Sequence, residues 1–181
     1  NPYKTTAFTY ISKNYPEKEK ILGKLVILLS FEETSDDNDK LEKLLLELEN
    51  IYYETPINEN ENISSKRLEN IFELSLKKFN QEFTWLSQTK NININFKKIN
   101  ILIAVIRNND LLFSQVNEMD IFLTYQGNNG DNKIINIAEP ANSRTPLPSA
   151  MKLLANLISG DLKTTSTLLI TNKSLSKYLS L

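Results

Sequence analysis

Residues 100–125 read NILIAVIRNNDLLFSQVNEMDIFLTY, and this stretch predicts the fold more directly than any other part of the chain. Apolar side chains occupy every position over 99–106 except Asn100, so a strand buried on both faces is expected there. The two asparagines at 108–109 tolerate a positive φ and predict a hairpin into a second strand over 111–116. A third strand is expected over 120–126. Strands joined by such short turns pair in antiparallel order.

The segments before this hairpin predict two further strands and two helices. β-branched and aromatic residues over Thr5–Ile11 predict a short strand, and the apolar run KLVILLSF at 24–31 predicts a central one. Large apolar residues recur at helical spacing over 36–53 and over 65–88, so both segments are expected to be amphipathic helices. Residues 91–96 alternate Asn with Ile and Phe, which fits either a strand or an extended linker.

The segments after the hairpin predict more strands and a terminal helix. A strand over 133–138 is expected to pair with 120–126 across the loop Gly127–Asp131. Residues 152–159 fit a helix or a strand, and the Gly-Asp pair that follows them favours a strand. Residues 166–171 (STLLIT) predict another strand, and Ser174 is expected to begin the last helix. The paired helices must then cover one face of an antiparallel sheet.

Composition excludes several classes of function. The 181 residues carry a formal net charge of −1 with no Cys and no His. A balanced charge argues against a nucleic-acid groove or a polybasic membrane patch. Without Cys and His, a catalytic triad, a thiol nucleophile and a zinc hydrolase are excluded, so carboxylates, hydroxyls or lysines must carry any chemistry.

The organisation predicted from the sequence is a single domain over residues 1–181, cut from a longer polypeptide. The chain begins Asn1-Pro2 without Met. No apolar run approaches the roughly 20 residues that span a bilayer, so membrane attachment is expected only through segments outside this chain. A cytoplasmic location is expected, either for a cytoplasmic protein or for the cytoplasmic domain of a membrane protein.

Three local patterns have both a functional and a structural interpretation. The acidic cluster over 32–39 offers oxygen ligands for Mg²⁺ or Mn²⁺, but acidic residues also favour the start of a helix, and that interpretation is preferred. The glycines of Gly127–Asp131 suggest a phosphate loop, although a loop between two strands without a following helix favours a hairpin. Trp85 lies in the apolar stripe of its helix and is expected in the core.

The order of these elements resembles the protein phosphatase 2C fold, that of the PPM-type, metal-dependent Ser/Thr phosphatases. The strand at 24–31 is similar to the family strand that delivers a metal-binding Asp-Gly pair. The stretch 100–125 is similar to the family hairpin that contains a Gly-Asp-Ser motif, and STLLITNKSLSKYL at 166–179 is similar to the strand that ends in Asp-Gly-Leu. The resemblance implies an α+β fold of two stacked antiparallel β-sheets flanked by helices, an α-β-β-α sandwich.

The motifs themselves differ from the family pattern. In place of the two Asp-Gly pairs and the Gly-Asp-Ser motif, this chain has Phe31-Glu32-Glu33-Thr34, Asn172-Lys173 and Asn117-Glu118-Met119. The resemblance therefore makes Glu32, Glu118 and Asn172 degenerate metal positions. A two-metal site needs several converging carboxylates, so neither a metal nor another cofactor is expected.

These departures suggest that the chain is not an enzyme. The leading hypothesis is a catalytically inactive phosphatase-2C-like module, a pseudophosphatase with a binding or regulatory role toward another protein or another part of its longer chain. The alternative is an active Mg²⁺- or Mn²⁺-dependent phosphatase with atypical ligands, drawn from Glu32, Glu33, Asp36 and Glu118. A third hypothesis is an unrelated α+β domain that binds a small molecule or peptide.

Overall fold

The hairpin expected around Asn108 is present in the computed structural model, which describes residues 4–33, 38–58, 62–89, 99–117, 119–127, 129–138, 153–163 and 165–172. Its strands are β3 (Asn100–Arg107) and β4 (Asp110–Val116), which pair in antiparallel register with Arg107 opposite Asp110. Asn108 has a φ of 51°, a value that asparagine adopts more readily than most residues. The prediction made from the Asn-Asn turn is confirmed.

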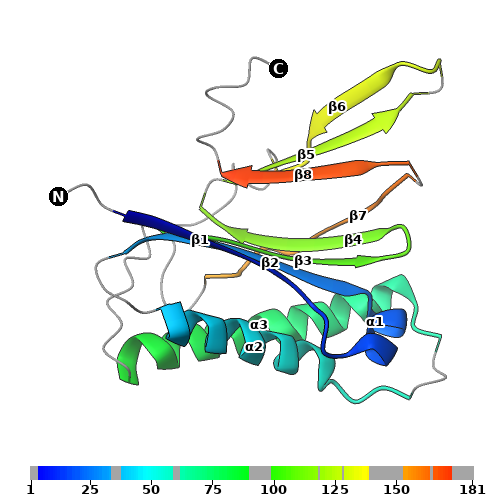
Figure 1. Cartoon of the computed structure of the whole chain (residues 1–181). Coiled ribbons are helices and arrows are strands. Elements are labelled where there is room, and N and C mark those ends of the chain that lie inside the picture. The colour runs from blue at the N-terminus through cyan, green and yellow to red at the C-terminus, as the bar shows by residue number, and fades with distance from the viewer. Residues whose placement is uncertain are drawn as a thin grey trace.

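Eight strands in the described residues form two antiparallel sheets (Figure 1). The first sheet has the order β1-β2-β3-β4-β7 and adds β1 (Lys4–Ile11), β2 (Lys24–Glu33) and β7 (Ile158–Asp161) to the hairpin. The second has the order β6-β5-β8. Its strands are β5 (Met119–Gln126), β6 (Asn132–Asn136) and β8 (Thr167–Asn172). The loop Gly127–Asp131 joins β5 to β6 as a hairpin, with the Gly127 N–H donating to the Asp131 carbonyl at 2.7 Å.

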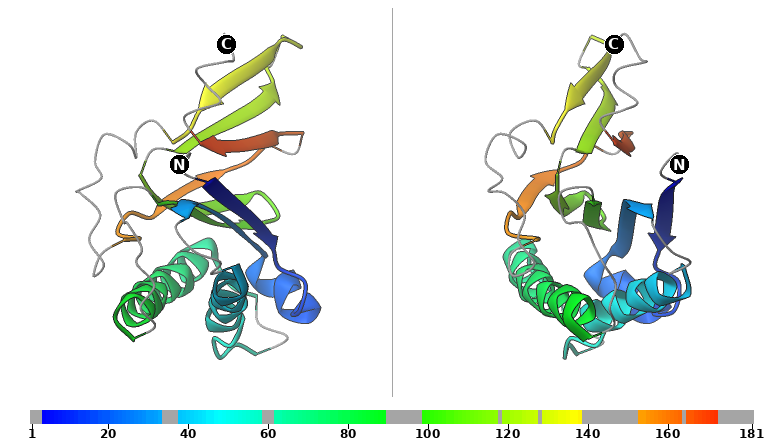
Figure 2. Two further views of the ribbon diagram at one scale, coloured as in Figure 1. Left: turned by 60° about the vertical axis from the view of Figure 1, so that its left-hand side comes forward. Right: turned by 90° about the vertical axis from the view of Figure 1, so that its left-hand side faces the viewer.

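The described helices lie together on the outer face of the five-stranded sheet, as Figures 1 and 2 show. They are α1 (Pro16–Leu22), α2 (Asn38–Tyr53) and α3 (Ser65–Thr89). The two long helices match their predicted ranges within about two residues. Helix α1 is missing from the prediction, which places no helix between the strands at 5–11 and 24–31. Proline suits the first turn of a helix, because the N–H it lacks has no helical partner there.

The core follows from the two faces of β3. Ile101, Ile103 and Val105 are buried toward the helices, whereas Leu102 and Ala104 are buried toward the second sheet. The helical side is filled by the apolar stripe of α3, including Phe72, Phe79 and Phe83, each no more than 1% exposed. A strand covered on both sides explains why its sequence is apolar at nearly every position.

One buried carboxylate fastens α2 to β1 and the residues that follow it. Glu49 of α2 is fully buried. The Tyr10 hydroxyl donates to its Oε2 at 2.5 Å, and the backbone N–H groups of Lys13 and Asn14 donate to its Oε1 at 3.0 and 3.2 Å. Burial raises the pKa of Glu49, but the hydrogen bonds from Tyr10, Asn14 and Lys13 lower it by more, so the pKa lies below its ordinary value.

The observed architecture confirms the α+β fold with two stacked antiparallel sheets. The strand expected over 152–159 is displaced, because β7 runs over Ile158–Asp161 and includes the Gly-Asp pair that was expected to follow the strand. An exposed edge strand tolerates such residues. The predicted terminal helix from Ser174 and the segment 91–96 lie outside the described residues. No helix in the described part of the chain has both the length and the hydropathy to cross a membrane.

Candidate functional site

The ends of several strands meet at one end of the two-sheet stack, at the left in Figure 1. The register establishes this. Ser30, near the end of β2, pairs with Asn100 at the start of β3, whose next residue, Ile101, pairs with Val116 at the end of β4. In the second sheet, Met119 at the start of β5 pairs with Asn172 at the end of β8. Because β5 follows β4 almost directly, both sets of strand ends face the same end of the molecule.

The predicted site residues are partly gathered here. Glu32 and Glu33 are the last residues of β2, in register with Thr5 and Lys4 of β1, and Asn172 is the last residue of β8. Asp36 and Glu118 lie outside the described residues. Among the described residues, no group of three or more His, Cys, Asp or Glu is arranged to hold a metal ion. The loss of the metal motifs therefore stays a prediction.

Asparagines support the backbone at this end. Asn117 has a φ of 59° and its side-chain amide donates to the Ile99 carbonyl. The Asn100 amide donates to the Ser30 hydroxyl at 3.3 Å, which links the end of β2 to the start of β3. Asparagine accepts the left-handed conformation better than most residues, so it suits this position.

Sequence reasoning missed a buried acid beside this end. Asp120 of β5 is only 4% exposed, and the Asn136 side-chain amide donates to its Oδ1 at 2.9 Å. Its Oδ2 has no hydrogen-bond partner in the described structure. An acidic residue inside an otherwise apolar strand is the sequence signal that indicates such a position.

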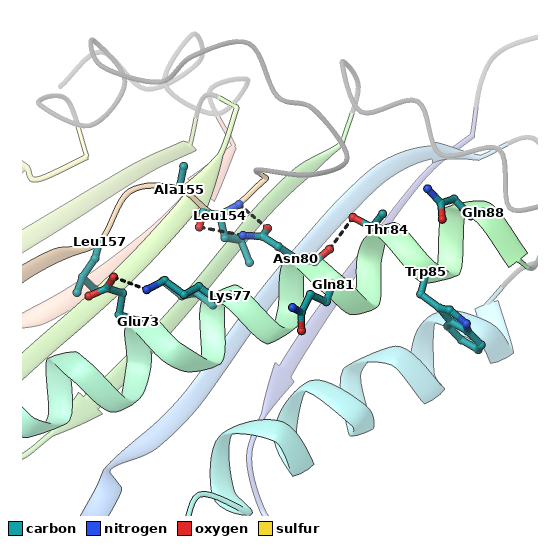
Figure 3. Close-up of a pocket in the computed structure, with 11 residues that line it drawn as sticks. Glu73, Lys77, Asn80, Gln81, Thr84, Trp85, Gln88, Leu154, Ala155 and Leu157 are labelled. Atoms are coloured by element: carbon teal, nitrogen blue, oxygen red, sulfur yellow. Dashed lines mark hydrogen bonds and ion pairs between the residues drawn. The ribbon is translucent and has the colours of Figure 1, made fainter.

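A second candidate site is a groove of about 730 Å³ beside α3 (Figure 3). One wall is α3, and the other is the segment 154–157. Asn80 holds the two walls together, because its Nδ2 donates to the Leu154 carbonyl at 3.3 Å and its Oδ1 accepts from the Leu154 N–H at 2.9 Å. The groove lining mixes apolar, amide and charged side chains: Glu73, Leu76, Lys77, Asn80, Gln81, Thr84, Trp85, Gln88, Leu154, Ala155 and Leu157.

Trp85 corrects one sequence prediction. It was expected in the core, but its side chain is 49% exposed and lines the groove. The reason is the helical repeat. Phe79 and Phe83 are four residues apart and share the buried face, whereas Trp85 is two residues beyond Phe83 and lies about 200° around the helix from it. An apolar stripe that includes both Phe83 and Trp85 is therefore wider than the face of α3 that the sheet covers.

Comparison with known proteins supports the fold but not a close relationship. No protein-family model matches the sequence, and no curated protein matches it either. Among solved structures, the Ser/Thr phosphatase Stp1 from Staphylococcus aureus is similar, with a TM-score of 0.58 and 11% identity over 99% of this chain and 80% of that one.

Two further phosphatase structures are similar to the same extent. The catalytic domain of the Ser/Thr phosphatase PstP, in complex with two manganese ions, has a TM-score of 0.57 and 9% identity, over 98% of this chain and 80% of that one. The S. agalactiae Ser/Thr phosphatase has a TM-score of 0.56 and 14% identity, over 98% and 82%. The chain therefore has the fold of the PPM-type phosphatases, and the resemblance seen in the sequence is confirmed at that level.

The same comparison corrects the expectation that this chain is not an enzyme. The solved structures named above are Ser/Thr phosphatases, which are enzymes. The prediction that the chain is not an enzyme, which was made from its altered motifs, is therefore wrong. Its error was to require the family's own residue types at the metal positions. Carboxylates from neighbouring positions can also serve as ligands for hard cations.

Proposed function

We propose that this chain is a phosphatase-like module with a binding role, and that its partner is a segment of another protein. The observation that carries the proposal is the groove beside α3. A concave surface that combines apolar side chains with a few convergent polar groups is the usual form of a binding site. Here Leu76, Leu157 and Trp85 supply apolar surface, and the amides of Gln81 and Gln88 supply donors and acceptors.

The charges of the groove favour an uncharged partner segment. Among the described residues that line it, the charged side chains are Glu73 and Lys77, whose carboxylate and ammonium groups lie 3.0 Å apart and neutralise each other. A charged partner side chain placed here would lose hydration without gaining a free counter-ion. We infer that the groove takes a segment of apolar and neutral polar residues from another protein.

Peptide selection tests this proposal, with the only tryptophan of the chain as the reporter. Peptides selected from a random phage-displayed library are expected to be rich in apolar and neutral residues and to shift the emission of Trp85. Ala155→Glu, which places a charge on the groove wall, is expected to weaken their binding about tenfold. Leu74→Glu, at a side chain 58% exposed on α3 and outside the groove lining, is the matched control. Selected peptides that leave the Trp85 emission and the Ala155→Glu affinity unchanged would contradict the proposal.

A second candidate function is metal-dependent hydrolysis of phosphoesters. It is supported by the register that brings Glu32 and Glu33 to the strand ends where β5 begins and β8 finishes. The residues that would hold Mg²⁺ or Mn²⁺ are Glu32, Glu33, Asp36 and Glu118, since carboxylate oxygens are the ligands these ions prefer. Such ions activate water and neutralise the phosphate charge.

Metal titration and a hydrolysis assay test this second candidate together. If the chain is a metal-dependent phosphatase, calorimetry is expected to show Mn²⁺ binding at millimolar concentration or below, and the protein is expected to hydrolyse p-nitrophenyl phosphate when Mn²⁺ is present. The double change Glu32→Gln with Glu33→Gln should lower both metal affinity and rate, by about 100-fold in rate if these groups hold the ion. Glu47→Gln on the exposed face of α2 is the control. Absence of Mn²⁺ binding would exclude this candidate.

A further inference from the structure

One outer strand of the second sheet, β6, has an open side in the part of the chain that the structure describes. Among the described strands it pairs with β5 alone, at the end of the order β6-β5-β8, and Figure 1 shows it as the outermost strand at the upper right. Its five residues, NKIIN, contain no proline and one lysine. Two large apolar side chains are exposed on it, Ile134 by 52% and Ile135 by 44%. Natural edge strands are usually protected by prolines, several charges or a covering segment, so this edge is suited to pairing with another strand.

The hydrogen-bond pattern shows which backbone groups face the open side. The Ile137 N–H donates to the Ile121 carbonyl, and the Gly127 N–H donates to the Asp131 carbonyl. In an antiparallel pair, residues alternate between bonding toward the partner and pointing away from it. The backbone groups of the odd-numbered residues of β6 therefore bond to β5. The N–H and C=O groups of Asn132, Ile134 and Asn136 point outward. An added strand would exchange two hydrogen bonds with Ile134.

Positive charge lies at the beginning of the same strand. A polar pocket of about 250 Å³ is lined by Lys133 of β6 and Lys163, together with Tyr125, Gly127, Asn129 and Asp131. The Lys163 ammonium sits 4.4 Å from the centroid of the Tyr125 ring, which holds it over β5. Two ammonium groups against one carboxylate leave the pocket with a net positive charge. Lys133 is directly opposite Tyr125 in the register, so it lies on the same face of the sheet.

We propose that the open edge of β6 binds an extended, acidic segment of a partner protein as an added fourth strand. This inference extends the proposed binding role to a second site, whose partner segment is acidic rather than uncharged. Backbone hydrogen bonds supply the pairing, and side chains on alternate faces supply the specificity. A partner residue opposite Lys133 points toward the lysine pocket and is acidic, whereas residues opposite Ile134 and Ile135 are apolar.

A short peptide written from this register is the probe. In antiparallel alignment from Asn136 to Asn132, the matching sequence is Thr-Val-Ile-Glu-Thr, capped at both ends and fluorescently labelled. Fluorescence anisotropy is expected to show saturable binding that weakens with added salt, because the Glu-Lys contact is exposed. The same peptide with Lys in place of Glu is expected to bind more weakly.

Two variants separate edge pairing from other modes of binding. Ile134→Pro removes the outward N–H and leaves the hydrogen bonds to β5 in place, so affinity is expected to fall at least about fivefold. Ile134→Thr keeps the N–H and the β-branched shape and should retain binding. Lys133→Glu should reverse the preference between the Glu and Lys peptides, and it tests the proposal independently if the proline variant fails to fold. Circular dichroism checks the fold of each variant.

The outcomes distinguish this inference from the proposed function. Equal affinity for wild type and Ile134→Pro, or no saturable binding of the Glu peptide, would overturn pairing at β6. The groove beside α3 lies in the helical layer on the other sheet, so peptides that shift Trp85 emission test that site separately. If the Glu peptide fails to bind at β6 while selected peptides still shift the Trp85 emission, the β6 inference alone is refuted.

Discussion

Glu49→Ala is expected to lower the free energy of unfolding by about 3–5 kcal/mol and the midpoint of thermal unfolding by roughly 10 °C. The carboxylate of Glu49 is fully buried and accepts hydrogen bonds from Tyr10, Lys13 and Asn14. Alanine removes the charged acceptor of these four hydrogen bonds, and a hydrogen bond to a charged group contributes about 1.5–3 kcal/mol. Urea unfolding followed by circular dichroism measures the loss.

Two controls identify the cause of that loss. Glu47→Ala removes the same side chain from an exposed position on the same helix and should change stability by less than about 0.5 kcal/mol. The second control is pH. Because the folded-state pKa of Glu49 is lowered, its stabilisation is present above the ordinary glutamate pKa of about 4.3 and is lost as the pH falls through the folded-state pKa. The difference between wild type and Glu49→Ala should therefore narrow in acid, and a constant difference would contradict this account.

Phe72→Ala is expected to be as damaging, with a loss of about 3–5 kcal/mol. Phe72 of α3 is fully buried in the layer between the helices and the first sheet. Its ring meets Tyr52 of α2 edge to face, with centroids 6.2 Å apart and an interplanar angle of 88°. The truncation removes apolar surface and an aromatic contact, and it leaves a cavity that both helices border.

The matched control for Phe72 lies two residues further along the same helix. Leu74 is 58% exposed, so Leu74→Ala should change the unfolding free energy by less than about 0.5 kcal/mol. Phe72→Leu, which keeps most of the volume, should recover much of the lost stability. Equal effects of Phe72→Ala and Leu74→Ala would contradict the assignment of these two faces of α3.

Several elements were predictable because their signals are local. The Asn-Asn turn and the apolar run over 99–106 predict β3, β4 and their pairing, since a turn and its flanking strands are adjacent in the chain. The long helices were predictable because burial on one face repeats with the helical period. Helix α1 was not, since seven residues beginning at a proline carry too short a pattern to distinguish from a turn.

The candidate site was less predictable because it depends on register between distant segments. The altered motifs identified Glu32, Glu33 and Asn172 from the sequence, but only the pairing of β2 with β3 and of β5 with β8 brings their backbones to one end of the stack. No sequence signal predicted the groove, because its walls, α3 and the segment 154–157, are held together by Asn80 across 74 residues.

By itself, the sequence determined the secondary structure around the central hairpin, the antiparallel order of its strands and the absence of Cys and His chemistry. These properties depend on composition and on patterns within a few residues. Only the tertiary structure decided that Trp85 is exposed, that Glu49 is buried and that, among the described strands, β6 pairs on one side alone. The physical reason is that burial depends on what another part of the chain places against a residue, and neither a hydrophobic period nor a charge pattern contains that information.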